Sequence, residues 1–154
     1  MGLKELKKKY ADLSKKYKLP NFVNLNEDFE VEKIERDTDL LLKAIRKVMM
    51  EKIVNSMSFL EMLLNPVNSP RMYHPFIRTM GNEDKSKIDS LYISFADLSL
   101  ISLDLEIRSD EAKEAELISH VFKKWNELKP LFCELLSNVK KPRDFVKKER
   151  TYFG

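Results

Sequence analysis

Hydrophobic residues recur along this chain at alternating intervals of three and four positions, the spacing of one face of an α-helix. In the first segment the stripe consists of Leu3, Leu6, Tyr10, Leu13 and Tyr17. We expect this helix to end near Pro20, because proline lacks the amide donor that a helix interior requires. Residues 21–39 hold two short apolar groups among acidic residues, which predicts a connector with a short helix around residues 27–35.

The longest uninterrupted stripe runs from about Thr38 to Asn65, a stretch without glycine or proline. Its members lie three or four positions apart: Leu42, Ile45, Met49, Ile53, Met57, Leu60 and Leu64. A helix of about 27 residues is roughly 40 Å long at the standard rise per residue. Further apolar positions widen the stripe, so we predict that this helix is central and contacts several neighbours.

Asparagine, serine and proline gather in residues 65–70, and this composition predicts a loop. Pro75 prevents a long helix in the following stretch. Residues 71–80 are therefore expected to form a short, irregular element that ends at Gly81.

Two further long helices are predicted after this element. Asn82 is the expected N-cap of the first, because asparagine side chains accept hydrogen bonds from the first helical turn. The alternating residues 103–107 would also suit a strand, but the length of the stripe and its context favour a helix. Ser109 or Asp110 is expected to cap the last helix, and Pro130 to kink it or divide it in two.

These elements predict an all-α fold, an antiparallel helical bundle of three to four long helices plus short connecting helices. The glycines are few: Gly2, Gly81 and Gly154. This scarcity argues against tight hairpins, phosphate-binding loops and dinucleotide folds, all of which depend on glycine. A length of 154 residues suits one core, so we predict a bundle domain over residues 1–142 and a basic C-terminal tail over 143–154.

The composition of the chain indicates in which cellular environment we expect the protein. No stretch approaches the roughly 18 apolar residues of a membrane span, so we expect no membrane association. Cys133 is the single cysteine, which favours a reducing, cytoplasmic location, and its neighbour Phe132 suggests that it fills a small buried space. Glutamine is absent and lysine and glutamate are abundant, as in proteins of hot-growing organisms, although nine asparagines and seven methionines point the other way.

Candidate catalytic chemistry is sparse. The two histidines, His74 and His120, are not preceded by the Glu-x-x pattern of di-iron bundles, and no cysteine–histidine spacing suits zinc. We therefore predict no catalytic residue, no metal and no cofactor. One weaker candidate is a loop in which Arg71, His74 and Arg78 together bind an anion.

Charge is segregated along the chain. Residues 1–20 carry a net charge of +5 and residues 140–154 of +4, which leaves about −6 on residues 21–139. If the basic ends meet, they form a phosphate-binding patch, so one alternative is a nucleic-acid-binding accessory protein. The residues that would bind nucleic acid are Lys7, Lys8, Lys15, Lys16, Lys147, Lys148 and Arg150.

Methionine is concentrated in the predicted central helix. Flexible thioether side chains fill irregular cores and also line adaptable partner grooves. The candidate partner-binding residues are Met49, Met50, Met57 and Met62. Since every strong pattern has a packing explanation, the leading hypothesis is a non-catalytic helical interaction or assembly protein that binds a protein partner or a second copy of itself.

Overall fold

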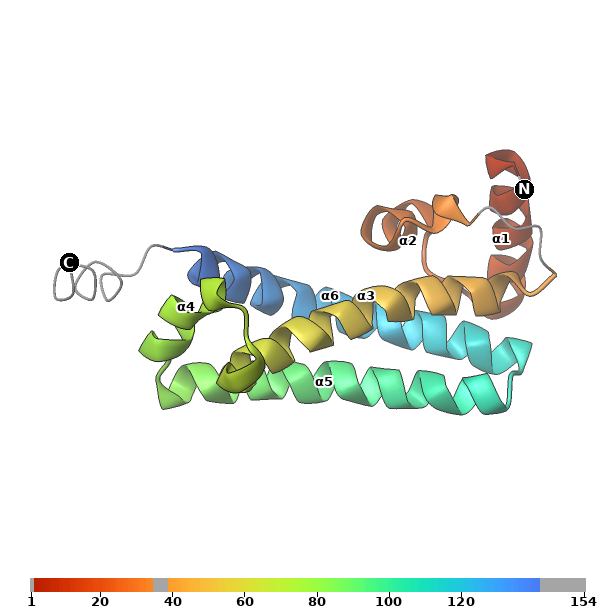
Figure 1. Cartoon of the computed structure of the whole chain (residues 1–154). Coiled ribbons are helices and arrows are strands. Elements are labelled where there is room, and N and C mark those ends of the chain that lie inside the picture. Colours follow the sequence, from red (N-terminus) through yellow and green to blue (C-terminus); the bar gives the residue numbers. More distant parts are fainter. Residues whose placement is uncertain (1, 35–38, 142–154) are drawn as a thin grey trace, which may run out of the picture.

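Three long helices form the body of this computed structural model, which describes residues 2–34 and 39–141. They are α3 (Leu41–Leu64), α5 (Asn82–Ile107) and α6 (Glu111–Lys140). Figure 1 shows them side by side, with α5 antiparallel to both of the others. The described residues contain no strand, so the predicted all-α antiparallel bundle is confirmed. Helix also extends through residues 103–107, as predicted.

Shorter elements pack against this bundle. Helix α1 (Leu3–Tyr17) lies at one end, against α6, whereas α2 (Phe22–Phe29) and the 3-10 turn η1 (Val31–Lys33) lie along its side, with α2 against α3 (Figure 1). At the other end lie the 3-10 turns η2 (Pro66–Asn68) and η3 (Arg71–Tyr73) and the short helix α4 (His74–Thr79). None of the helices in the described ranges is long and apolar enough to cross a membrane.

The connector helix predicted around residues 27–35 is wrong in position. It begins earlier because the Asn21 side chain accepts hydrogen bonds from the backbone N–H groups of Val23 and Asn24, at 2.9 and 3.3 Å. It ends at Phe29 because Glu30 adopts a left-handed conformation with φ of 52°. A sequence pattern of apolar residues alone does not reveal such side-chain caps.

The long helices begin and end close to their predicted limits. Gly81, rather than Asn82, occupies the N-cap position of α5, and its backbone N–H donates to the Asp84 carboxylate at 3.2 Å. Asp110 caps α6 by accepting a hydrogen bond from Ala112 at 2.8 Å. Helix α6 continues through Pro130 and is not divided there, and Pro130 is exposed.

Aromatic side chains from several helices meet in the middle of the core. Trp125 of α6 lies 5.5 Å from Phe29 of α2 and 6.2 Å from Phe95 of α5, measured between ring centroids. Phe132 lies 5.8 Å from Phe95 and 5.9 Å from Phe59 of α3. Such tilted and edge-to-face pairs add directional stabilisation to the area that they bury. This cluster holds α2 and the three long helices together.

A buried arginine joins the three long helices near the α5–α6 connection. Arg46 of α3 is only 1% exposed. Its Nε donates to the Glu114 carboxylate of α6 at 2.5 Å, and its Nη1 donates to the Ser102 hydroxyl of α5 at 2.8 Å. Nη1 also lies 3.0 Å from the carboxylate of Glu106. Because each helix contributes a partner, this cluster fixes the register of the bundle at this end.

We predict that Arg46→Met destabilises the fold by about 3–5 kcal/mol, because it leaves the Glu114 carboxylate buried without its cation. The double variant Arg46→Met/Glu114→Met should recover at least half of this loss, since it buries no unpaired charge. Urea-induced unfolding followed by circular dichroism measures both values. A loss below about 1 kcal/mol in the single variant would show that the cluster does not hold the bundle.

The hydrogen bond from Arg46 holds the pKa of Glu106 below its ordinary value of 4.5. A carboxyl group with a lowered folded-state pKa stabilises the fold above its unfolded pKa, and this contribution is lost as the pH falls. We therefore expect Glu106→Gln to be less stable than the unmodified chain at pH 7 and the difference to close below about pH 4.5. Thermal melts between pH 3 and pH 7 measure the difference; a gap that is independent of pH contradicts the assignment.

Candidate partner-binding surface

Helix α5 carries apolar side chains on two opposite faces. Its inner face is buried in the bundle and contains Ile88, Leu91, Phe95, Leu98 and Leu105. Its outer face presents Ile93, Leu100, Leu103 and Ile107, whose exposed fractions range from 51% to 77%. At 3.6 residues per turn, the two sets centre on opposite sides of the helix axis. The outer side chains therefore point away from both α3 and α6.

The outer apolar residues are regularly spaced. Ile93, Leu100 and Ile107 lie seven positions apart, and Ala96 and Leu103 follow the first two by three. This is the a/d pattern of a helix that pairs with another helix in a coiled coil. We name these five residues the α5 outer stripe. The stripe spans two heptads, or about 21 Å.

Single exposed leucines are ordinary on protein surfaces, whereas a continuous apolar stripe marks an interaction site. The signal for this stripe was present in the sequence as surplus apolar positions in α5. From the sequence alone the apolar positions of α5 form a single amphipathic pattern, and the second apolar face was not predicted. The structure separates the two faces by burial.

Acidic side chains border the α5 outer stripe. Asp97 and Asp104 lie along one edge, Asp89 lies at its N-terminal end, and α5 has no lysine or arginine between Lys87 and Ile107. All three aspartates are exposed. Asp104 forms one ion pair, with Arg108 at 3.4 Å just beyond the end of the helix. The edge is therefore acidic over most of its length.

The other edge of the stripe faces α3 and has a different charge. There Glu106 is paired with Arg46, and Lys43 and Lys47 of α3 are near enough to help lower the pKa of Glu106. On this edge of the stripe, basic side chains therefore already lie near the carboxylate of Glu106. Apart from Glu106, the acidic side chains between Lys87 and Ile107 that have no basic neighbour on α5 lie on the edge formed by Asp97 and Asp104.

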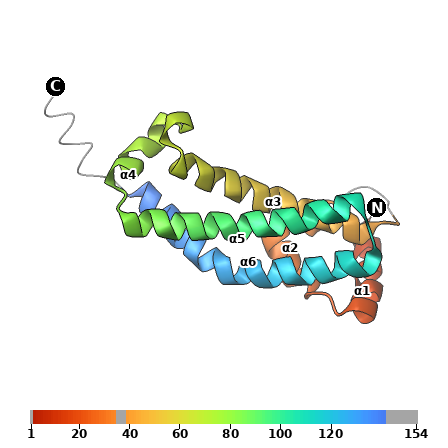
Figure 2. The same ribbon diagram turned by 90° about the horizontal axis from the view of Figure 1, so that it is seen from below.

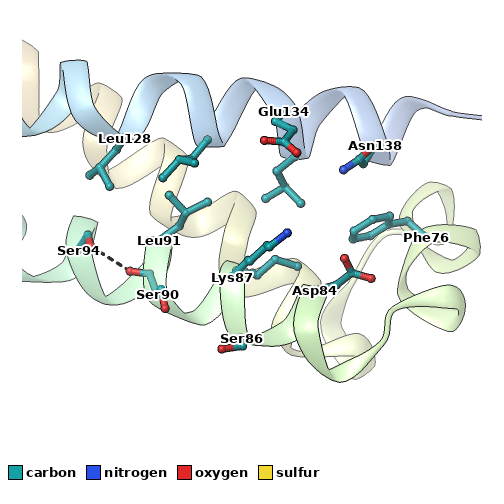
Figure 3. Close-up of a pocket in the computed structure, with 13 residues that line it drawn as sticks. Phe76, Asp84, Ser86, Lys87, Ser90, Leu91, Ser94, Leu128, Glu134 and Asn138 are labelled. Atoms are coloured by element: carbon teal, nitrogen blue, oxygen red, sulfur yellow. Dashed lines mark hydrogen bonds between the residues drawn. The ribbon is translucent and has the colours of Figure 1, made fainter.

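A groove lies between the first half of α5 and the second half of α6, with Phe76 of α4 at one end (Figure 3). Its volume is about 390 Å³. Most of its surface is apolar, and its apolar lining residues are Phe76, Ile88, Leu91, Leu128, Leu131 and Leu135. Its polar lining residues are Asp84, Ser86, Lys87, Ser90, Ser94, Glu134 and Asn138. The serines are small and leave space between the helices.

The chemistry of this groove suits apolar contact better than catalysis. None of its lining residues is a histidine, a cysteine or a tyrosine. Lys87 forms an ion pair with Glu83 at 3.4 Å, and the Ser94 hydroxyl donates to the Ser90 carbonyl at 3.0 Å (Figure 3). The groove can therefore hold an apolar side chain or ligand fragment, but its lining lacks an activated nucleophile and base.

The methionines predicted to bind a partner differ in exposure. Met49 and Met50 are buried in the core, and Met57 is half-buried against it. Met62 is exposed. In this conformation only Met57 and Met62 offer surface to a partner, and their role in binding stays a prediction.

The predicted nucleic-acid-binding lysines are only partly described. Lys7, Lys8, Lys15 and Lys16 are exposed on α1, and Lys16 lies 3.5 Å from Glu111 at the start of α6. The end of α6 is about 45 Å away along this 30-residue helix, at the opposite end of the bundle (Figure 2). Lys147, Lys148 and Arg150 lie outside the described residues. Nucleic-acid binding by these residues stays a prediction.

The predicted anion-binding residues lie in η3 and α4. Arg71 and Arg78 are exposed and His74 is half-buried, and none of the three lines the α5–α6 groove. Their role also stays a prediction. Within residues 2–34 and 39–141, no group of three or more histidine, cysteine, aspartate or glutamate side chains could hold a metal ion.

Comparison of the chain with protein-family models, curated proteins and solved structures finds no match.

Cys133 is exposed, so the prediction that it fills a buried space is wrong. Cys133 lies on the outer side of α6, whereas its neighbour Phe132 packs into the aromatic cluster.

We predict that a maleimide modifies the Cys133 thiol completely in the folded protein. Mass spectrometry under native and denaturing conditions compares the rates; labelling that requires unfolding would contradict the exposed position.

Proposed function

We propose that this chain is a non-catalytic helical interaction protein and that the α5 outer stripe docks an α-helix of its partner. The observation that carries the proposal is the second apolar face of α5, opposite the face buried in the bundle. A partner helix on this face would complete a four-helix arrangement around α5 with the spacing of coiled-coil packing. Such docking would remove four large apolar side chains from water.

The expected strength of this contact follows from its size. Complete burial of an exposed leucine or isoleucine side chain contributes about 1.5–3 kcal/mol. Association itself costs about 4–15 kcal/mol in lost freedom of motion. Burial of the four large side chains of the stripe would therefore contribute about 6–12 kcal/mol. This gain is similar in size to the cost of association, so the stripe alone supports reversible docking. The adjoining α5–α6 groove offers additional apolar surface for a larger partner.

We predict that Leu100→Asp abolishes the complex while leaving the fold intact. A charge in the middle of the stripe would be buried by a docked helix, whereas in the free chain this side chain is 64% exposed. The free chain should lose no more than about 1–2 kcal/mol, because aspartate is a poorer helix former than leucine and would lie near Asp97 and Asp104. Val67→Asp is the matched control, because Val67 is 90% exposed and lies in η2, away from the stripe.

The measurement is native mass spectrometry of the tagged chain recovered gently from cells that naturally make it. We expect the unmodified chain and Val67→Asp to retain the same bound protein or second copy, and Leu100→Asp to lose it. Equal retention by all three variants, or an unmodified chain that is recovered with neither a bound protein nor a second copy, would refute docking on the stripe.

A further inference from the structure

We infer that the helix docked on the α5 outer stripe belongs to a different protein and carries lysine or arginine along the edge that faces Asp97 and Asp104. This inference rests on the proposed function and adds the identity of the partner surface. It follows from the charges that border the stripe, from the way these charges would meet in a self-pair, and from the length of the stripe.

Self-pairing would gain no opposite charges between the two α5 helices themselves. In an antiparallel pair centred on Leu100, residues on the same edge of the two helices face each other, so Asp97 of each copy would approach Asp104 of the other. In a parallel pair, opposite edges meet, and Asp104 would face Ser99. Like charges at such positions are destabilising, and an aspartate opposite a serine gains no ion pair. Neither orientation gains an ion pair between the two α5 helices.

The shortness of the stripe gives the charges at its edges more weight. Coiled coils that are recognised by their heptads extend over at least three to four of them, whereas the stripe contains two. A pair of such short stripes needs favourable charges at its edges in order to be specific. A basic partner helix supplies them, because its cations would lie beside Asp97 and Asp104 without burying either group.

The two edges of the stripe fix the orientation of the partner charges. The edge toward α3 already contains Lys43 and Lys47 near Glu106, so additional cations are unfavourable there. Cations are favourable on the other edge, where Asp97 has no basic neighbour on α5 and Asp104 has only Arg108. The fitting partner is therefore an amphipathic helix with an apolar a/d seam and one basic edge.

Three synthetic peptides of equal length test this inference against the full chain. The first has leucine and isoleucine at the a and d positions and lysine along one edge; the second has glutamate in place of these lysines. The third has the composition of the first in an order that destroys the heptad spacing, and it controls for general attraction to an acidic surface. Fluorescence anisotropy at low and moderate salt measures the dissociation constants.

We expect the basic peptide to bind at least about tenfold more tightly than the acidic and reordered peptides, with affinity that falls as salt rises. The variant Asp97→Lys/Asp104→Lys should reverse the preference between the basic and acidic peptides. Both substituted positions are exposed, so an unchanged thermal melt confirms that this variant is folded.

Equal binding of the basic and acidic peptides, or no binding of either, would overturn the inference. Self-association of the unmodified chain that Leu100→Asp disrupts would also overturn it, but would leave the proposed function standing. Failure of the proposed function is recognised separately, by complexes that survive Leu100→Asp.

Discussion

Helix α5 is apolar on two sides, and a bundle of three long helices buries only one of them. Ile88, Phe95 and Leu98 are in the core, whereas Leu100 and Ile107 of the same helix are in water. The inner face accounts for the position of α5 against α3 and α6. The outer face has no such role in the described part of the chain. An exposed apolar stripe weakens solubility, and a chain that retains one is expected to use it.

The bundle holds this stripe rigidly in place. Arg46 links α3 to α5 through Ser102 and Glu106 and to α6 through Glu114, close to the C-terminal half of the stripe. The aromatic cluster around Trp125 packs against the opposite side of α5 through Phe95. Because helix α5 is fixed by both polar and aromatic contacts, a partner meets a preformed surface and need not order it.

Much of the fold could be predicted from the sequence, because helix formation depends on local spacing. The central helix was predicted from Thr38 to Asn65 and is found from Leu41 to Leu64. The misplaced element, α2, depends on the Asn21 cap and on the left-handed Glu30, which a hydrophobic pattern does not report.

The candidate site was harder to predict, because burial depends on which helices become neighbours. In the sequence, Leu98 and Leu100 are equivalent apolar positions of one amphipathic stretch; in the bundle the first is buried and the second is exposed. Arg46 was overlooked for the same reason, since its partners lie 56 to 68 positions away. Cys133 was wrongly predicted to be buried, because an apolar neighbour in the sequence does not guarantee burial in the fold.

The most direct test of the central claim is carbene footprinting of the chain alone and in the complex recovered from cells. If α5 docks a partner through its outer face, modification of Leu100, Leu103 and Ile107 falls sharply in the complex, while that of Val67 is unchanged. Unchanged modification of the three stripe residues, with protection elsewhere on the bundle, would contradict the account.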